Sequence, residues 1–376
     1  MKKFLFLLLL LLAPQMGFAY YVWHPCCNSC NRLAGWWADA EGMFLWRKKR
    51  YYPPLATASA TAVPILGDPS TRILFGDQTL GNSPKAGYRI DAGLWWDCCW
   101  GLGGGFYSSG TEKYQFKAGG NSLGQPFLGR PFFNAASGLQ EVDLISDPTL
   151  ILLEPSIFNG SIEIDMVNRN MGGDAYTRFH FIKQSRVTLD LLGGFYYNQL
   201  VDNLNITTQK TVNSLIELPE VIRVNDQFNC TNNFYGALVG GVAEFCYNRW
   251  AIRTTCKLGL GSMQKKVSIK GSTIAFTGAD LGTIEVGEFG LLANLSNIGK
   301  HSHHKFEVIP QLEARLEFRV WKQLRLTAGY TCIYWPSVVL AGEQVDLILN
   351  TPEPSFHHKD KSFWMQGATA GLYVCF

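Results

Sequence analysis

The sequence FWMQGATAGLYVCF, residues 363–376, alternates between two sets of side chains and ends on an aromatic residue. One set runs from Trp364 to Phe376 and contains a single polar residue, Gln366. Alternation with a period of two is the pattern of a β-strand, and this stretch is longer than most strands of soluble sheets. It predicts a long C-terminal strand of a membrane barrel, with the last strand of a soluble sandwich as the less favoured alternative.

The start of the chain has the layout of a secretory signal peptide. Lys2 and Lys3 form a positive segment, residues 4–12 are apolar, and Ala19 is the kind of small residue that precedes a cleavage site. The apolar run is too short to cross a bilayer as a helix. The chain is therefore expected to have three parts: a signal peptide over residues 1–19, a cysteine-rich periplasmic lead-in over residues 20–35, and an outer-membrane β-barrel over residues 36–376.

The composition distinguishes between a secreted soluble protein and an outer-membrane barrel. After the signal peptide there is no run of about 18 apolar residues, so no transmembrane helix is expected. Only 17% of the residues are charged, against about 25% in soluble chains. The mean hydropathy of +0.01 suits a membrane barrel, whose outward apolar residues alternate with polar inward ones. A net charge of +3 gives no reason to expect a nucleic-acid partner.

Residues 233–260 predict a β-hairpin with a two-residue turn at positions 248–249. In the register that this turn sets, one face is apolar throughout and carries Tyr247 and Trp250 at the turn end. Aromatic side chains at this level are typical of the interfacial girdle of a membrane barrel. Together with Phe376, these two residues are the expected lipid-interface aromatics.

The opposite face of this hairpin carries charges. Glu244 lies opposite Arg253 in the same register, which is a favourable cross-strand pair. An arginine or lysine that faced lipid near mid-membrane would cost about 2–4 kcal/mol, so this face is expected to point inward. The strands predicted at 305–320 and 324–335 alternate in the same way. The expected inward, pore-lining residues are Glu244, Arg253, Lys257, Glu313, Arg315, Glu317, Arg319 and Arg325.

The alternating segments together predict an all-β fold, a transmembrane antiparallel up-and-down β-barrel of about 12 strands, within a range of 10–14. Long and short connections alternate, which is the outer-membrane pattern of long extracellular loops and short periplasmic turns. The predicted strands are 36–46, 88–96, 101–118, 161–167, 174–183, 187–197, 204–209, 233–247, 250–260, 305–320, 324–335 and 363–376.

The glycine-rich run GLGGG at residues 101–105 is not a nucleotide-binding loop. Aromatic strand residues follow it rather than a helix, so the phosphate-binding interpretation fails its context test. Glycines inside a strand mark a bend or the close approach of other groups. This run therefore predicts small residues where the barrel lumen is crowded or the strand bends.

The ten cysteines favour disulfides in an oxidising envelope. The cysteines at residues 26–30 form a weak metal motif, because His24 is the sole candidate for a fourth ligand. The hairpin register places Cys246 and Cys256 on opposite faces, so they are not expected to bond to each other. Free buried thiols are less favoured than disulfides and more favoured than a metal site.

Five histidines fall in two predicted loops on the same outer side: His301, His303, His304, His357 and His358. These histidines either form a metal site or are solvated loop residues. The second interpretation is favoured, because no acid or cysteine spacing fixes a metal geometry. There is no Ser/His/Asp arrangement and no pair of carboxylates in a cleft. No catalytic residue, metal, cofactor or enzymatic activity is therefore expected.

Four stretches of the second half of the chain carry a family resemblance. They are GLLANLSNIG (290–299), FEVIPQLEARLEF (306–318), GYTCIYWPSVVLAGEQVDLILN (329–350) and the C-terminal FWMQGATAGLYVCF. In this order and spacing the sequence resembles the beta-barrel porin family 7, a planctomycete-type family of outer-membrane barrels. The resemblance covers nearly the whole chain after the signal peptide. It implies an outer-membrane barrel, and it implies neither a substrate nor catalytic residues.

Two functions are expected from this class. The first is a porin-like passive channel for small hydrophilic solutes in a bacterial outer membrane, because the inward face has mixed charge. The alternative is a structural or adhesive barrel without transport activity, cross-linked through its cysteines. The expected partners are outer-membrane lipid, small polar solutes, further copies in a homo-oligomer, and the barrel-assembly machinery, which reads closing strands similar to the one that ends here at Phe376.

Overall fold

The computed structural model describes residues 35–81, 83–97, 99–149, 156–214, 220–277, 283–350 and 354–376. The predicted signal peptide and all but the last residue of the lead-in lie outside these residues. Apart from one short 3-10 helix, η2 (Ala341–Gln344), the regular elements described are strands. No helix of the described segments is long and apolar enough to cross a membrane.

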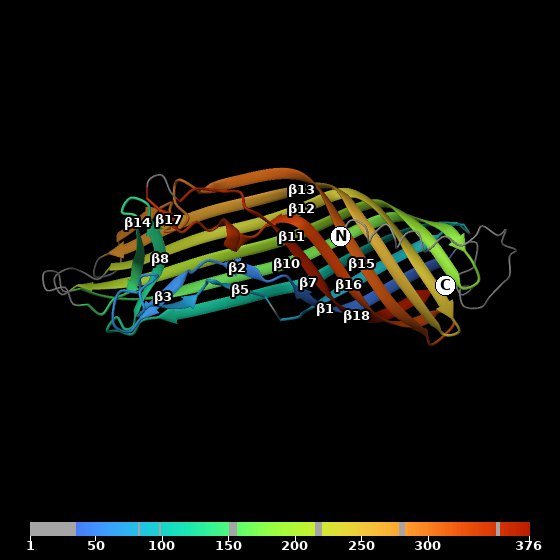
Figure 1. The fold of residues 1–376 in the computed structure, drawn as a ribbon, viewed down its shortest axis with the longest axis horizontal. Helices are drawn as coiled ribbons and strands as arrows, with labels where there is room; N and C mark the ends of the chain where they lie inside the picture. The colour runs from blue at the N-terminus through green and yellow to red at the C-terminus, as the bar shows by residue number, and fades with distance from the viewer. Residues whose placement is uncertain are drawn as a thin grey trace.

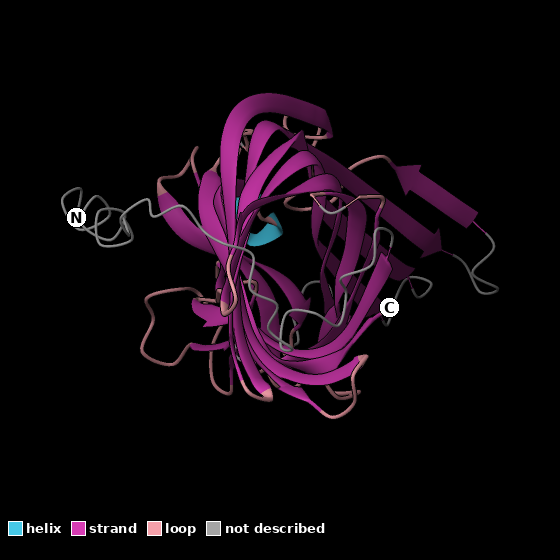
Figure 2. Cartoon of the chain, turned by 90° about the vertical axis from the view of Figure 1, so that its right-hand side faces the viewer, coloured by secondary structure: helices cyan, strands magenta, loops and turns pink. Residues whose placement is uncertain are grey.

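Ten antiparallel strands of the described residues form a closed ring (Figures 1 and 2). Pairing of β1 with β18 joins the two ends of the chain, and pairing of β12 with β13 completes the circuit. The ring strands, in the order in which they pair, are β1 (Gly35–Arg47), β6 (Lys85–Trp95), β7 (Trp100–Gly119), β10 (Ser156–Lys183), β11 (Val187–Ser214), β12 (Glu220–Tyr247), β13 (Trp250–Thr277), β15 (Gly299–Arg319), β16 (Leu324–Val339) and β18 (Asp360–Cys375).

The ring confirms the all-β antiparallel barrel, and its ten strands lie at the lower limit of the predicted range. Strands β10 and β11 each run for 28 residues, whereas the sequence had been interpreted as two shorter strands in each place. The stretches interpreted as turns there, residues 168–173 and 198–203, continue the strands without a break in pairing between β10 and β11. They contain asparagines that are buried inside the barrel, so their turn-like composition has another cause.

The two ends of the barrel have connections of different length. Residues 184–186, 248–249 and 320–323 make short turns at one end. At the same end β6 leads into β7, and Trp36 and Phe376 pair through their backbones. At the other end the connections fold into small sheets rather than open loops (Figure 1). One has two strands, β2 (Arg50–Tyr52) and β5 (Gln78–Leu80), and one has five, β3 (Ala56–Ser59), β4 (Arg72–Phe75), β8 (Phe127–Asn134), β9 (Leu139–Ser146) and β17 (Ile348–Leu349). A further strand, β14 (Thr283–Gly287), pairs with the far end of β13.

The hairpin of β12 and β13 has the register that the sequence predicts. Glu244 pairs with Arg253, and Tyr247 pairs with Trp250. The turn residue Asn248 has a φ of 56°, the left-handed conformation that two-residue hairpin turns require. Pro310 on β15 produces no bulge, because it stays in register with β13 and lies one residue beyond the point where pairing with β16 ends. Its missing N–H is therefore tolerated on the unpaired edge.

The barrel has two zones that differ in which face is apolar. The proximal zone lies between the short turns and the level of the paired residues Phe234 and Met263, and the distal zone lies beyond it. In the proximal zone of β12 and β13 the outward side chains are mostly apolar, and Tyr235, Val239, Phe245, Ile252 and Leu258 are all exposed. In the distal zone the outward side chains of β13 are Gln264, Lys266, Ser268 and Lys270, while the inward ones include Val267 and Ile269, which are 1% exposed.

Candidate functional site

The interior of the proximal zone contains seven of the eight residues that the sequence predicts to face inward. Glu244, Arg253, Lys257, Glu313, Arg315, Glu317 and Arg325 are all buried there. Arg319 lies instead at the rim, where its guanidinium donates a 2.6 Å hydrogen bond to the carbonyl oxygen of Asn248. Period-two alternation therefore locates the charged face, and the pairing among these residues decides what that face can do.

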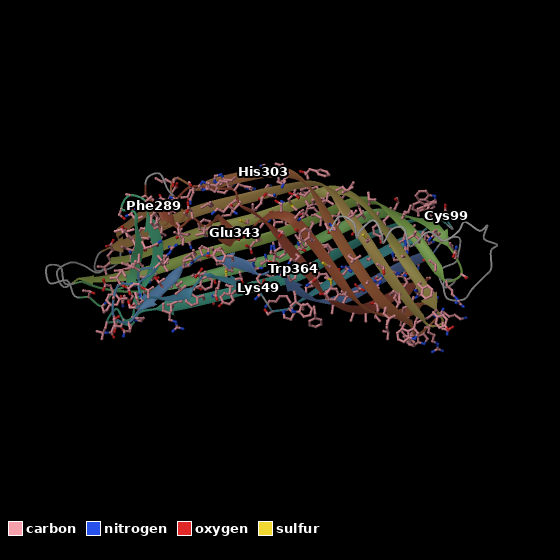
Figure 3. The ribbon with its side chains drawn as sticks, in the orientation of Figure 1. Lys49, Cys99, Phe289, His303, Glu343 and Trp364 are labelled. Carbon is pink, nitrogen blue, oxygen red and sulfur yellow. The ribbon has the colours of Figure 1, made fainter. Side chains whose placement is uncertain are left out.

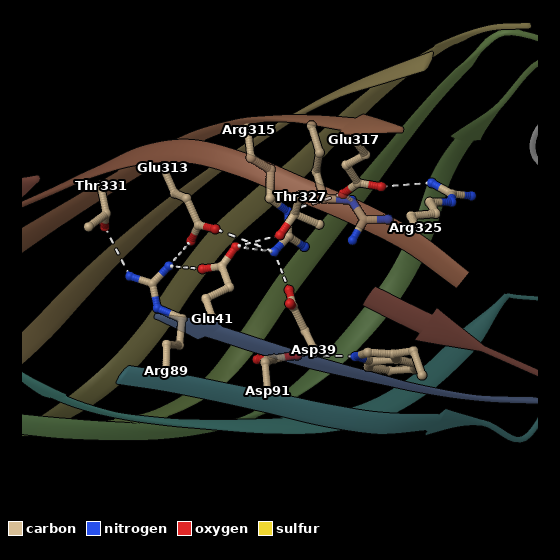
Figure 4. Close-up of polar contacts among 12 residues, drawn as sticks. Asp39, Glu41, Arg89, Asp91, Glu313, Arg315, Glu317, Arg325, Thr327 and Thr331 are labelled. Carbon is tan, nitrogen blue, oxygen red and sulfur yellow. Dashed lines mark hydrogen bonds and ion pairs between the residues drawn. The ribbon is translucent and has the colours of Figure 1, made fainter. Parts of the chain in front are cut away.

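Arg315 is the centre of the largest group of ion pairs (Figure 4). Its guanidinium contacts carboxylates from two strands, namely Asp39 and Glu41 of β1 and Glu313 and Glu317 of β15, at 3.1–3.6 Å for the last three. Glu313 also accepts a 2.5 Å bond from Arg89 of β6. These contacts join opposite parts of the ring wall across the interior.

A second group of ion pairs surrounds Tyr373 of β18. Glu244 binds Arg253 at 2.6 Å and Arg325 at 2.7 Å, and Glu317 binds Arg325 at 2.9 Å. The guanidinium carbons of Arg253, Arg325 and Arg315 lie 4.4, 5.5 and 5.9 Å from the centroid of the Tyr373 ring. Cations over an aromatic face are attracted to it, so this one ring brings three guanidinium groups together inside the barrel.

Several members of the interior were not among the predicted site residues. Asp39 and Glu41 alternate with outward-facing residues along β1. Arg89 and Asp91 occupy the equivalent positions of β6, where they alternate with the exposed Tyr88 and Ile90. The same alternation rule applied to that strand would have identified them. Asp174, Arg178 and Asp190 lie within the predicted strands 174–183 and 187–197, so the same rule identifies them as well.

A third set of contacts fills the space beside the ion pairs. Asp91 accepts hydrogen bonds from the Trp37 indole N–H at 3.1 Å and from the Tyr176 hydroxyl at 2.8 Å. Lys257 pairs with Asp174 at 2.7 Å. Nearer the short turns, Arg178 pairs with Asp190 at 2.5 Å and lies over the rings of Trp37 and Trp95. Aromatic rings and charges thus fill this part of the interior together.

Glycines of β7 make room for this filling. A Cβ on Gly103 would lie 2.8 Å from the Trp37 ring and 2.9 Å from the Tyr176 ring, and a Cβ on Gly105 would lie 2.9 Å from Asp91 Oδ2. The GLGGG run therefore marks a crowded lumen, as the sequence indicates. The cavity that remains among these side chains has a volume of about 60 Å³. It is lined by Asp39, Arg89, Asp91, Asp174, Arg315 and Tyr373, among others, and its volume is enough for a few water molecules.

The distal zone is closed by the folded connections. Tyr52, Leu55, Phe75 and Leu128 from these connections form one apolar core with Phe228 and other inward residues of the long strands. Figure 2 shows η2 within the outline of the ring. We refer to these folded connections, residues 48–81, 83–84, 120–149 and 340–350, as the distal plug.

Buried polar contacts fix the distal plug to the barrel wall. Arg130 of β8 pairs with Asp226 of β12 at 2.6 Å, and both side chains are almost fully buried. The backbone N–H of Ala341 in η2 donates a 2.9 Å hydrogen bond to Oδ2 of Asp202 on β11. A buried charge left without its partner costs several kcal/mol, so these contacts hold the plug in one position.

Arg50 is a third attachment point of the distal plug. It binds Glu112 at 2.9 Å and Asp202 at 3.4 Å. Burial alone would lower the pKa of Arg50, but Asp202, Tyr52 and Glu112 together hold that pKa above its ordinary value. Burial raises the pKa of the Tyr52 hydroxyl, and Asp202 raises it further. Arg50 therefore stays charged and Tyr52 stays neutral, which keeps this attachment intact over the ordinary range of pH.

The predicted interfacial aromatics lie on the outside at the end with the short turns. Tyr247 is 55% exposed, Trp250 is 49% exposed, and Phe376 is 41% exposed and stacks on Trp36 with a centroid distance of 4.4 Å. This position suits the membrane interface, because amphipathic rings prefer the headgroup level.

The cysteines are in different states. Cys375 is disulfide-bonded, whereas Cys230, Cys256 and Cys332 are free thiols. Cys246 is buried and Cys256 is exposed, so they lie on opposite faces as the hairpin register predicts. The predicted group at residues 26–30 lies outside the described residues. Among the residues that are described, no group of three His, Cys, Asp or Glu side chains is arranged to hold a metal ion.

A closed antiparallel barrel with an apolar outer belt, aromatic residues near the short turns and a charged interior is a barrel of the outer-membrane class. The sequence matches the family described as "Putative beta barrel porin-7" over residues 37–376. The chain therefore belongs to this porin family and is an outer-membrane β-barrel protein. No curated protein matches the sequence at a significant level.

Solved structures with similar folds share little sequence with this chain. The outer membrane protease OmpT from Escherichia coli has 9% identity and a TM-score of 0.38, and the alignment covers 91% of this chain and 97% of that one. A FadL homologue from Pseudomonas aeruginosa has 8% identity and a TM-score of 0.26, with 94% and 92% covered. At this level of similarity, the proteolytic activity of the first is not carried over to this chain.

Proposed function

We propose that this protein is a sealed outer-membrane barrel that carries a rigid structural or adhesive platform, and that it does not act as an open passive channel. The observation that supports the proposal is the filled interior of the proximal zone. Ion pairs centred on Arg315 and Tyr373 span the lumen, and the cavity left among the described side chains is about 60 Å³. A small hydrophilic solute with its water does not fit through such a space.

The distal plug supports the same function. Its attachments through Arg50, Arg130 and Ala341 are buried, so it is built as part of the folded core and not as a loosely held loop. In this proposal the protein resides in a bacterial outer membrane, and the plug end faces outward. The assembly machinery recognises β18, and the barrel has no catalytic role. Further copies or cross-linked partners attach through the distal surface.

The direct test is single-channel conductance of the refolded protein, without residues 1–19, in a planar bilayer. We expect no reproducible conductance steps over a wide voltage range. Reproducible steps from the unmodified protein would overturn the proposal. Folding of each sample is checked by its heat-modifiable migration on a gel.

A sensitised variant makes a silent result informative. The triple variant Glu244→Ala, Arg253→Ala and Tyr373→Ala removes one anion, one cation and the central ring without changing the net charge. Because these side chains fill the proximal interior, we expect the variant to conduct. The matched control is Tyr247→Ala on the outer face, which leaves the interior filled and should stay silent.

The passive channel for small hydrophilic solutes is the second candidate. The family description favours it, because the family is described as a porin. In that case the ion pairs would separate in the membrane, and the current would change its ion selectivity when Arg253 and Arg315 are replaced by glutamate. The same bilayer experiment distinguishes the two candidates.

A further inference from the structure

Two pairs of rings connect β15 to the segment that precedes β18. His301 stacks on Phe356 with a centroid distance of 3.7 Å, and His303 faces His358 with a centroid distance of 5.1 Å. His303 lies on the upper side of the barrel in Figure 3, well away from the short-turn end where Cys99 is labelled. Residues distant in sequence thus place two imidazoles side by side on an accessible surface.

The second imidazole of this pair is already oriented. Nε2 of His358 lies 2.9 Å from Oδ1 of Asp360, which leaves Nδ1 of His358 for another ligand. Metal-binding histidines commonly use one ring nitrogen for the metal and donate the other N–H to a carboxylate, and that carboxylate fixes the tautomer. Neither ring nitrogen of His303 has a hydrogen-bond partner among the described residues, and its side chain is exposed.

We propose that His303 and His358 together bind one divalent transition-metal ion, with water completing its coordination. Imidazole nitrogen is a preferred ligand of Ni²⁺, Cu²⁺ and Zn²⁺. No third side chain of the described residues joins the pair in a metal-binding group, so the site is open and exchanges its metal readily. It differs from a closed structural site, in which four protein ligands surround the ion.

The charges around the pair permit a cation. Lys265, which is fully buried below His303, donates a 2.6 Å hydrogen bond to Oδ2 of Asp360 and lies 3.7 Å from Glu307. Lys305 also contacts Glu307, at 3.4 Å. Two carboxylates thus balance these two ammonium groups.

A bound metal would join β15 to the segment before β18 at the surface. On the N-terminal side of Gln311, β15 pairs with β13 along one edge and has no paired strand along the other. The metal would fasten residues 354–358 to this open edge. The site therefore goes beyond the sealed-barrel function and does not depend on it, because it lies outside the charged interior.

The test is titration of the folded protein in detergent micelles with NiCl₂, followed by isothermal titration calorimetry. We expect a site that weakens at least tenfold in His303→Ala and in His358→Ala. Thiol sites elsewhere in the chain are unchanged by these variants, so the difference between wild type and variant isolates this site. The matched control is His304→Ala, because His304 lies on the opposite face and pairs with Gln264.

Hydrogen exchange gives a second readout. Ni²⁺ should slow amide exchange over residues 354–360 in the wild type and should have no such effect in His303→Ala. Equal Ni²⁺ affinity of the wild type and both single variants would overturn the proposal. Loss of binding in His304→Ala of the same size would also overturn it, since adventitious surface histidines would then explain the signal.

Discussion

The proximal and distal zones of β12 and β13 are built from the same two strands, yet they present opposite faces to their surroundings. In the proximal zone Val239 and Leu258 point outward and Glu244 and Arg253 point inward. In the distal zone Lys266 points outward and Phe228 points inward, where it is 0% exposed. Alternation continues through both zones without a shift of register. What changes is the surroundings, from lipid outside and ion pairs inside to water outside and an apolar core inside.

This comparison shows that an alternating strand pattern answers one question and leaves another open. A period of two shows that the two faces differ, but it does not show which face is inside. At Ser161–Val167 the apolar residues Ile162, Ile164 and Met166 point into the distal core, whereas the apolar residues of the proximal zone point to lipid. The inversion therefore marks the height at which the barrel leaves the membrane.

The largest expected effect comes from removing one charge of the proximal interior. Glu317 is 0% exposed and pairs with Arg253, Arg315 and Arg325. Glu317→Leu removes one carboxylate that these three guanidinium groups share and leaves excess positive charge buried, which should lower the free energy of unfolding by about 3–5 kcal/mol. Urea unfolding in lipid vesicles, followed by tryptophan fluorescence, measures it.

The control for this change is Arg319→Leu at the rim, which should cost about 1 kcal/mol or less. Equal losses in the two variants would contradict the assignment of the charged interior as the main support of the proximal zone.

The second prediction places the same new charge at two heights of one face of β13. Leu258→Arg puts a cation in the lipid-facing belt and should cost about 2–4 kcal/mol. Ser268→Arg lies on the same face in the distal zone, where water solvates the charge, and should change stability by less than about 0.5 kcal/mol. Unfolding curves of the two variants in vesicles compare them directly. A similar cost at both positions would remove the distinction between the zones.

The third prediction concerns the crowding of the proximal interior. Gly103→Ala brings a Cβ to within 2.8 Å of the Trp37 ring, and overpacking of this kind typically costs about 1–3 kcal/mol. Gly193→Ala on the outer face meets no atom closer than 4.0 Å, so it should be neutral or slightly stabilising. If thermal unfolding of both variants in detergent matched the wild type, the interior would have more free space than the cavity volume indicates.

The smallest expected effect is a difference in thiol chemistry that leaves stability unchanged. Cys256 faces lipid in the proximal zone, and Cys230 is fully buried in the distal core. In vesicles, an apolar maleimide should label Cys256 and a charged, membrane-impermeant maleimide should not. Neither reagent should label Cys230 before unfolding. Peptide mass spectrometry after labelling reads both sites, and rapid labelling of Cys256 by the charged reagent would place it in water.

The sequence predicts the barrel class, the β12–β13 register and seven of the eight inward charges, because these follow from local alternation and one turn. It does not predict the strand lengths, since Asn168, Asn170 and Asn198 resemble turn residues and are instead buried polar groups of long strands. Local sequence patterns do not predict the distal plug either. Contacts such as Arg130 with Asp226 join residues 96 positions apart, and no periodicity along the chain encodes them.

The pairing of the interior charges with one another is the part of the candidate site that sequence reasoning could not decide. Alternation indicates that Arg253 and Arg315 face inward, but a charged wall around water and a charged interior paired with itself have the same pattern. The outcome depends on the diameter of the ring and on bulky neighbours such as Trp37 and Tyr373. Both are properties of the closed ten-stranded barrel and not of any one strand.

The most direct test of the two-zone account is an accessibility scan along the outward face of β13 in lipid vesicles. Spin labels are attached to single cysteines at Ile252, Thr254, Leu258, Leu260, Gln264, Lys266, Ser268 and Lys270, in a background that lacks the other accessible thiols. Collisions with oxygen should dominate up to Leu260, and collisions with a water-soluble nickel chelate should dominate from Gln264 onward. A uniform response along the whole strand would contradict the account, because both zones would then lie in the same medium.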